Sequence, residues 1–227
     1  MPNAGKRYKA NKAKVTKKSY TSEEAIALLK SLEKAKFDES VELHLRLGVD
    51  PKQGDQQVRG TVTLPYGVGK TKRVAVFAHG DKEIEAKQAG ADLVGGKELI
   101  DKIRQTEKCE FDVAVATPEM MKELAGVAKI LGPKGLMPSP KNETVTPNVA
   151  KAVQELKKGK IAFKNDDTGN VHQAIGKLSQ PNEQVLSNLS TFVEALKRAK
   201  PASSKGIYLR NATLTTTMGP GVAIALD

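Results

Sequence analysis

Residues 41–49 read VELHLRLGV, a regular alternation of apolar and polar side chains. Val or Leu occupies every odd position, and the even positions include Glu42, His44 and Arg46. Because successive side chains of a strand point to opposite faces, this pattern predicts a half-buried strand with one polar face. After the turn-like segment PKQGDQ the alternation continues over residues 58–64, which we expect to form the antiparallel partner of the first strand.

Further segments typical of α+β structure lie on either side. Upstream, Thr21 and Glu24 form a capping-box signature that predicts a helix over residues 22–35. Downstream, IAFK, NDDTG and NVHQAIGK predict a second antiparallel hairpin, and Pro181 opens a helix that reaches Arg198. The final segments IYLRNATLTTT, MGPG and VAIAL predict one more hairpin.

The middle of the chain has a different pattern. Three short apolar runs, RVAVFA, ADLVGG and FDVAVAT, are separated by helical stretches near residues 81–89, 97–105 and 119–131, and another helix follows near residues 148–158. Continuous apolar strands between helices predict a parallel sheet covered on both sides. The sequence therefore predicts an α+β outer domain with an antiparallel sheet, split by an inserted three-layer α/β domain with a parallel sheet.

These patterns also give the expected domain boundaries. We assign residues 1–18 to a basic flexible arm, residues 19–67 plus 160–227 to the outer domain, and residues 68–159 to the insert. Glycines mark the two connections and could act as a hinge: Gly67, Gly69 and Gly159. A rigid contact between the domains is the alternative.

The charge balance indicates a polyanionic partner. The 227 residues contain 37 Lys and Arg against 26 Asp and Glu, a formal charge of +11 that favours binding to nucleic acid. Residues 1–18 alone hold seven basic side chains and no acidic one. They predict either an arm that becomes ordered on a phosphate backbone or a merely solvating tail. The outer domain without this arm has 14 basic and 13 acidic residues, so shape and hydrogen bonding must supply its specificity.

Several other classes of protein are excluded. No apolar stretch approaches the roughly 18 residues of a membrane span, and the basic start lacks the apolar core of a signal peptide, so we expect no membrane partner and a cytoplasmic location. Cys109 is the only cysteine and has no second thiol for a disulfide or a zinc site. The histidines His44, His79 and His172 lack metal-ligand spacing. We therefore expect no metal and no cofactor.

An enzyme is the competing class. Gly69-Lys70-Thr71 mimics the end of a phosphate-binding loop, but Leu64 stands where the first glycine of that motif belongs, and a strand rather than a helix follows. No G-x-G-x-x-G opens a helix after a predicted strand. A nucleotide-dependent enzyme using residues 67–71 and a general DNA-binding protein remain the alternatives to an RNA-binding protein without catalytic activity, which is our preferred interpretation.

The segment AKILGPKGLMPSPKNETV, residues 128–145, indicates a family. By physics alone it is a rigid basic loop after a helix. It resembles, however, the signature of the first large-subunit ribosomal protein family in its bacterial form. The resemblance spans nearly the whole chain, through KFDESVELHLRLGVDPK, VRGTVTLPYGVGK, GADLVGG, FDVAVATPEMM, KNDDTGNVH and TTTMGP. It implies a structural protein of the ribosome's mobile stalk beside the tRNA exit site, present as a monomer within the ribosome.

The resemblance also implies partners and a binding surface. The outer domain would bind large-subunit ribosomal RNA, the hinged insert would assist release of tRNA from the exit site, and the RNA surface would also bind the protein's own mRNA and repress its translation. Carried over by position, the RNA surface comprises Lys36, Phe37, Glu42, Arg46, Asp166, Thr168, Gly169, His172, Thr217, Met218 and Gly219.

These residue types suit RNA binding. Lys36 and Arg46 can hold phosphates, while Phe37 and Met218 can lie against a base or a ribose, although either could instead belong to the core. The hydroxyls at positions 168 and 217 can bond a ribose 2′-hydroxyl, the group that distinguishes RNA from DNA, and the glycines allow close backbone approach. We expect some of the carboxylates to orient neighbouring side chains rather than to touch RNA.

Overall fold

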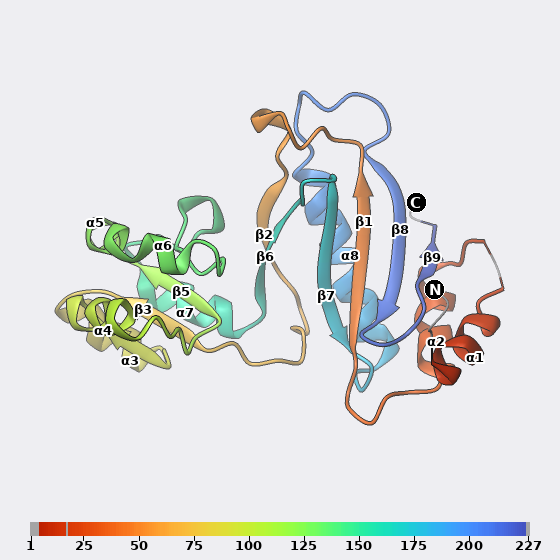
Figure 1. Cartoon of the computed structure of the whole chain (residues 1–227), viewed down its shortest axis with the longest axis horizontal. Coiled ribbons are helices and arrows are strands. Elements are labelled where there is room, and N and C mark those ends of the chain that lie inside the picture. Colours follow the sequence, from red (N-terminus) through yellow and green to blue (C-terminus); the bar gives the residue numbers. More distant parts are fainter. Residues whose placement is uncertain (1–4, 17, 226–227) are drawn as a thin grey trace. The chain divides into compact units, whose positions relative to one another are not determined.

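The computed structural model describes residues 5–16 and 18–225, which belong to two compact units (Figure 1). The outer unit comprises the residues up to Gly69 and those from Ala162 onward, and the inserted unit comprises Lys70–Ile161. The chain thus passes between the units after Gly69 and after Ile161, where the sequence predicted divisions after Gly67 and Gly159. An antiparallel α+β unit interrupted by a parallel α/β unit confirms the predicted fold class.

The outer unit is built on a four-stranded antiparallel sheet in the order β7-β1-β8-β9. Its strands are β1 (Ser40–Leu47), β7 (Asn170–Lys177), β8 (Leu209–Thr216) and β9 (Val222–Ile224). β1 suits an interior position because its alternate apolar side chains are fully buried, with none more than 2% exposed. The alternation therefore predicted this strand correctly.

Two helices cover the buried face of the sheet: α2 (Ser22–Ser31) and α8 (Asn182–Arg198) (Figure 1). The predicted capping box begins α2, since the Thr21 hydroxyl accepts the N–H of Glu24 and the Glu24 carboxylate accepts the N–H of Thr21. α2 ends at Ser31, earlier than expected, because Leu32 takes an extended backbone and is buried. Since both helices lie on one side, the polar face of the sheet stays open.

Two of the predicted strand pairings are wrong. β2 (Arg59–Thr63) pairs with β6 (Lys160–Lys164) rather than with β1, whose two edges are taken by β7 and β8. Within the described residues a single bridge, Asn165 to Val171, stands where a hairpin of β6 and β7 was expected. Asn165 instead binds Val58, whose N–H donates to the Asn165 side chain at 2.8 Å and whose carbonyl accepts the Asn165 N–H at 3.0 Å. These bonds direct β6 toward β2.

The basic N-terminal segment also differs from the prediction of a flexible arm. Lys6–Lys14 form helix α1. Asn11 is 1% exposed, and its side chain donates to the Glu33 carbonyl at 2.9 Å and accepts the Glu33 N–H at 3.0 Å. Arg7 adds an ion pair with Glu39 at 3.8 Å. These contacts fix α1 to the outer unit, and a run of lysines gives no sign of them.

The inserted unit has a three-stranded sheet whose strands are parallel, as predicted, and lie in the order β4-β3-β5. The strands are β3 (Val74–Phe77), β4 (Leu93–Gly95) and β5 (Val113–Ala116). One face packs against α3 (Asp81–Gln88) and α7 (Val149–Lys157), and the other against α4 (Lys97–Thr106), α5 (Met121–Leu124) and α6 (Ala128–Leu131). The three layers are therefore confirmed.

Short 3₁₀ turns complete the chain. The turn Ala125–Val127, which contains Gly126, separates α5 from α6, so the single helix expected over residues 119–131 is broken. Two further turns lie at Gly54–Gln56 and Pro140–Asn142. None of the helices within residues 5–16 and 18–225 has both the length and the apolar composition that a membrane span requires.

Candidate RNA interface

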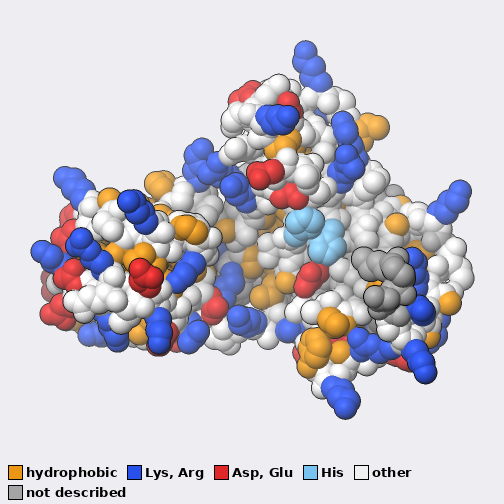
Figure 2. All heavy atoms as spheres, in the orientation of Figure 1, with side chains coloured by type: hydrophobic (Ala, Val, Ile, Leu, Met, Phe, Trp, Pro, Cys, Tyr) orange, Lys and Arg blue, Asp and Glu red, His pale blue; other side chains and the backbone are white. Residues whose placement is uncertain are grey.

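The open face of the four-stranded sheet carries polar side chains from three strands. Glu42, His44 and Arg46 of β1 alternate with the buried apolar residues. Strand register places His172 of β7 and Thr213 of β8 on either side of His44. α8 lies behind the sheet in Figure 1, and Figure 2 shows histidine side chains near the centre of the same view, with acidic side chains beside them. The alternation of β1 thus produces a polar strip across the sheet, which we call the sheet face.

The turn between β6 and β7 lies at one end of the sheet face. Asp166 accepts hydrogen bonds from the Thr168 hydroxyl at 2.8 Å, from the Thr168 N–H at 2.9 Å and from the Asn170 N–H at 2.7 Å. Desolvation disfavours the charged carboxylate, but these hydrogen bonds outweigh it and hold the pKa of Asp166 well below its usual range. Gly169 suits the turn because its φ is +79°, and its carbonyl accepts the Leu47 N–H at 2.9 Å, which fixes the turn to the end of β1.

A buried carboxylate holds two loops together at the other end of the sheet face. Glu39 is 2% exposed and accepts hydrogen bonds from the N–H groups of Ala35 at 2.7 Å and Met218 at 3.0 Å, and from the Thr216 hydroxyl. Desolvation raises the pKa of Glu39, but these hydrogen bonds and the charge of Arg7 outweigh it, so the pKa lies below its usual range. Glu39 therefore stays charged and joins the loop before β1 to the β8–β9 turn.

These two joined segments display exposed side chains. Phe37 is 54% and Met218 52% exposed, which excludes the alternative that either belongs to the core. The Thr217 hydroxyl accepts the Ser40 N–H at 3.0 Å, and the Thr217 N–H donates to the Ser40 carbonyl at 3.1 Å. The hydroxyl is thus fixed in place by a bond that leaves its own hydrogen for another acceptor. An added Cβ at Gly219 would overlap the Thr216 hydroxyl oxygen, so a larger residue there would displace the hydroxyl that donates to Glu39.

The site residues predicted from sequence lie along β1 and its neighbour β7 and at the two ends of β1. Lys36, Phe37 and residues 217–219 lie where β1 begins, whereas Arg46 and residues 166–169 lie where β1 ends. Glu42 and His172 lie between these groups, and both Lys36 and Arg46 are exposed. A strand rises about 3.3 Å per residue, so the groups are separated by roughly 25 Å, the length of several nucleotides.

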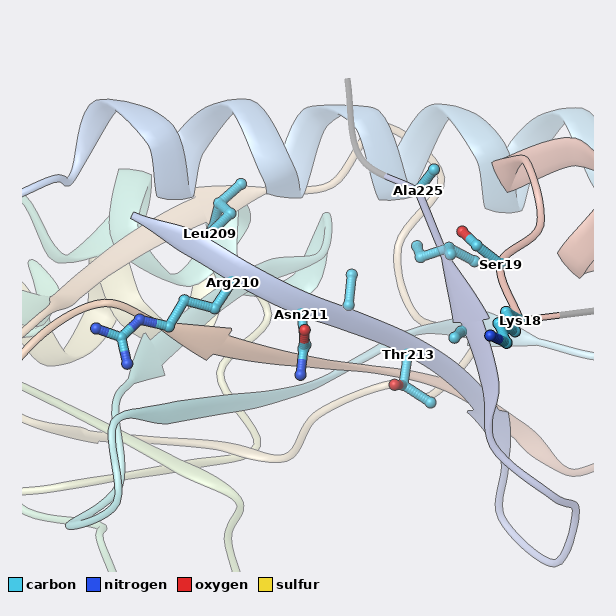
Figure 3. A pocket seen from close by; sticks show the side chains of 10 residues that line it. Lys18, Ser19, Leu209, Arg210, Asn211, Thr213 and Ala225 are labelled. Carbon is cyan, nitrogen blue, oxygen red and sulfur yellow. The ribbon is translucent and has the colours of Figure 1, made fainter. Parts of the chain in front are cut away.

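A groove extends the sheet face toward β9 (Figure 3). β9 pairs with residues 212–214 of β8, so the groove follows the earlier part of β8. Its lining includes Lys18, Ser19, Arg210, Asn211 and Thr213. Figure 3 shows Arg210 and Lys18 at opposite ends, with Asn211 and Thr213 between them. Basic ends and a polar floor suit a phosphate backbone.

Comparison with known proteins identifies the family. The model of the Ribosomal protein L1p/L10e family matches residues 29–220. The chain belongs to this family. A curated relative, "Large ribosomal subunit protein uL1" of Solibacter usitatus (strain Ellin6076), is 51% identical over 220 residues, which cover 97% of this chain and 93% of the relative. The family resemblance read from the sequence is therefore confirmed, and so is the prediction that this L1-family protein is not an enzyme.

The geometry of the Gly69-Lys70-Thr71 segment agrees with that conclusion. The segment leads into β3, and the Lys70 ammonium lies 3.4 Å from the Asp112 carboxylate rather than over a helix N-terminus. Within residues 5–16 and 18–225, no group of three or more His, Cys, Asp or Glu side chains is arranged to hold a metal ion.

The site predicted from sequence omits several residues of the sheet face. His44 touches His172, with the two Nδ1 atoms 2.8 Å apart, and its even position in the alternation was a usable signal. Thr213 pairs with His44 in the strand register, and Asn211 pairs with Arg46. Glu39 carries no comparable signal, because an isolated loop glutamate is usually exposed.

Proposed function

We propose that the outer unit binds a folded element of large-subunit ribosomal RNA along the sheet face. The observation that carries this proposal is the buried Glu39 carboxylate, which joins the Phe37 loop to the Met218 turn. Two exposed apolar side chains are thereby held beside a polar strip, an arrangement typical of a surface that meets a partner. Membership of a ribosomal protein family, and a relative named as a large ribosomal subunit protein, support RNA as that partner.

The sheet face and the loops at its two ends supply different kinds of contact. Phe37 and Met218 pack against bases or riboses, and Lys36 and Arg46 bind phosphates. The Thr217 hydroxyl donates to a ribose 2′-hydroxyl, because its oxygen is held in place by the Ser40 N–H while its own hydrogen remains available. Since the outer unit without its basic arm is nearly neutral, these hydrogen bonds and the shape of the surface supply the specificity.

The carboxylates of the sheet face act mainly on their neighbours. Asp166 binds the Thr168 hydroxyl at 2.8 Å and so fixes that hydroxyl as an acceptor for RNA. Gly169 brings the backbone of the same turn close to the ligand without a side chain. A carboxylate beside RNA is therefore tolerable where it orients a donor or acceptor rather than facing a phosphate.

A titration with Phe37→Ala and Met218→Ala tests this proposal. Phe37→Ala should bind a stalk ribosomal RNA fragment more weakly by about 1–3 kcal/mol, the loss expected when an aromatic side chain that stacks on a base is removed. Met218→Ala should also weaken binding. Ile84→Ala is the control, since Ile84 is 57% exposed but belongs to the inserted unit. Equal binding by wild type and both variants would contradict the proposed surface.

A general DNA-binding protein is the second candidate to be tested. If bulk charge dominated, duplex DNA of the same length would displace the RNA fragment at comparable concentrations, and binding would fall steeply with salt. We expect RNA to be preferred, because 2′-hydroxyls and a folded RNA shape are absent from DNA.

We further propose that the inserted unit contacts tRNA in the ribosomal exit site. Its GPKG loop, residues 132–135, is held by the Lys134 ammonium, which donates to the Glu107 carbonyl at 2.8 Å, and Lys141 nearby in sequence is exposed. We expect these lysines to contact departing tRNA. Ribosomes carrying Lys134→Gln and Lys141→Gln should release exit-site tRNA at an altered rate, whereas Lys97→Gln, an exposed lysine of α4, should not change it.

The glycines at the connections support a hinge. Gly67, Gly69 and Gly159 all have positive φ, of 59°, 70° and 110°. The side chain of Asn188 donates to the Gly67 carbonyl at 2.8 Å, so we expect movement to occur after Gly67. Gly69→Ala should narrow the distribution of distances between a label on Cys109, in the inserted unit, and a label on a cysteine introduced in α8.

The RNA surface should also serve a regulatory role. We expect the protein's own mRNA to contain a fold similar to the ribosomal RNA element and to bind the same sheet face, so that surplus protein represses translation. Ribosomal RNA should then displace the mRNA competitively, and Met218→Ala should weaken both complexes alike. An mRNA that binds wild type and Met218→Ala equally well would contradict the shared surface.

A further inference from the structure

A chain of four titratable side chains crosses the sheet face. The Nδ1 atoms of His44 and His172 are 2.8 Å apart. Their Nε2 atoms approach carboxylates, with His172 Nε2 3.4 Å from Asp166 and His44 Nε2 3.9 Å from Glu42. The order is Glu42, His44, His172, Asp166, which we call the histidine chain.

The number of protons on the two rings decides how many of these contacts are favourable. The short contact needs one Nδ1–H donor and one Nδ1 lone pair. When both rings are neutral, the donor ring has a bare Nε2, which presents a lone pair to its carboxylate. One added proton gives both Nε2 atoms a hydrogen and keeps the central hydrogen bond. A second added proton makes both Nδ1 atoms donors and breaks the contact. The central hydrogen bond and both contacts with the carboxylates are therefore favourable together only when the two rings carry one added proton.

In the free protein, the surroundings of His44 disfavour this added proton on its ring. Desolvation lowers the pKa of His44, the neighbouring His172 acts in the same direction, and Glu42 opposes both. The other charged groups facing the pair are Arg46 of β1 and Asp166 of the β6–β7 turn. The register neighbours on β7 and β8 are uncharged: Asn170, Ala174, Asn211, Thr213 and Thr215.

Bound RNA changes this balance. Its phosphates would approach a strip that already holds the carboxylates Glu42 and Asp166, and Arg46 is the one cation among the groups named above. Repulsion between like charges is relieved when a nearby neutral group takes up a proton, since added negative charge stabilises the imidazolium. Of the groups in the strip, the histidine pair is suited to take up a proton between about pH 6 and pH 8.

We propose that RNA binding to the sheet face is coupled to the uptake of one proton by the His44–His172 pair, which makes His44 a further residue of the RNA surface. This inference rests on the proposed RNA-binding function of the same face. It also explains why two acidic residues and two histidines occupy a surface that meets a polyanion: the protonated pair cancels part of their charge in the complex.

The test is a titration of the full chain with the stalk ribosomal RNA fragment at about pH 6 and about pH 7.5. Wild type should bind on the order of threefold to tenfold more tightly at the lower pH, as expected for uptake of up to one proton. His44→Gln and His172→Gln keep polar side chains but cannot titrate, so both should lose most of this difference. His79→Gln should keep it, because His79 belongs to the inserted unit and pairs with Glu123 at 3.7 Å.

Calorimetry in two buffers of different ionisation enthalpy measures the proton directly. We expect uptake of up to one proton per complex for wild type and His79→Gln, and much less for the other two variants. RNA binding with the same affinity at both pH values and no proton uptake would overturn this inference and leave the proposed function intact. Uptake that persists in a His44→Gln/His172→Gln double variant would also overturn it, whereas no RNA binding at either pH would overturn both.

Discussion

The buried Glu39 carboxylate accepts the backbone N–H of Met218 at 3.0 Å, across 179 positions of the chain. This bond joins the last turn of the sheet to the loop that precedes its first strand. The same carboxylate accepts the Ala35 N–H at 2.7 Å, so Phe37 and Met218 are displayed at a fixed spacing. The apolar part of the candidate RNA surface therefore depends on a charge that does not itself reach the surface.

Replacing Glu39 should disturb both loops. The amide of Glu39→Gln has one oxygen and one NH₂ group, so it cannot accept at both positions, and we expect the free energy of unfolding to fall by about 1–3 kcal/mol. RNA affinity should fall as well, because Phe37 and Met218 lose their spacing. Glu33→Gln is the control, since Glu33 is exposed and its interaction with Asn11 uses the backbone. Denaturant titration and RNA binding are the measurements, and a Glu39→Gln variant that matches wild type in both would contradict this role.

Asp166 should make stability depend on pH in the acid range. Its folded-state pKa is lowered below the unfolded value of about 3.9, so the stabilisation is present above about pH 4 and is lost as pH falls through the folded pKa. Asp166→Asn should remove about 1 kcal/mol of unfolding free energy at neutral pH, a modest loss because the side chain is 38% exposed. Below about pH 4 the variant should lose stability less steeply than wild type. Unfolding measured at several pH values checks this, with Asp167→Asn as the control. If the unfolding free energies of wild type and Asp166→Asn fell equally below about pH 4, this role of Asp166 would be contradicted.

Asn188 should be important for the stability of the outer unit. It is fully buried in α8, accepts the Tyr66 N–H at 3.1 Å, and donates to the carbonyls of Gly67 at 2.8 Å and Ile175 at 2.9 Å. Asn188→Leu removes the partner of three backbone groups, of which the Ile175 carbonyl is buried and the other two are partly buried, so we expect a loss of about 2–4 kcal/mol in unfolding free energy. Ser190→Ala on the exposed side of the same helix should change stability by less than about 0.5 kcal/mol. Comparable stabilities for the two variants would show that other groups satisfy the backbone.

The lysines of α1 should contribute long-range attraction rather than specificity. Lys6, Lys9, Lys12 and Lys14 are exposed, while Asn11 fixes the helix. Changing these lysines to Gln should reduce the slope of log affinity against log salt by about 0.7–0.9 for each phosphate that is no longer neutralised. Preference for RNA over DNA should remain. An unchanged salt slope would indicate that α1 stays away from the RNA.

Local patterns predicted the elements of this fold well. The alternation at residues 41–49 gave β1 and its polar face, and the apolar runs of the middle segment gave the parallel sheet with its helices. These predictions succeeded because side-chain periodicity reflects which faces are buried. Pairing of β2 with β6 was not predictable in this way, since it depends on the contact of Asn165 with Val58, 107 positions away.

The candidate site was likewise only partly predictable, because its geometry depends on contacts between distant segments of the chain. Exposure of Phe37 and Met218 could not be decided from sequence, because an aromatic residue and a methionine are equally compatible with a core. Their positions depend on Glu39, whose partners come from three separate segments of the chain. His44 could have been included, because it shares its strand face with Glu42 and Arg46, but its contact with His172 required the register of β7.

The most direct test of the RNA surface is a titration of the stalk ribosomal RNA fragment with wild type, Thr217→Val and Thr217→Ser at physiological salt. Thr217→Ser keeps the hydroxyl that binds the Ser40 N–H, whereas Thr217→Val removes it, and denaturant unfolding of both variants confirms that they fold. We predict that Thr217→Val weakens RNA binding by about 1 kcal/mol or more, on the order of one hydrogen bond, and that Thr217→Ser binds nearly as wild type does. Equal affinities for all three proteins, with a loss only when the α1 lysines are removed, would show that the protein binds RNA as a general polyanion and that the sheet face is not its RNA surface.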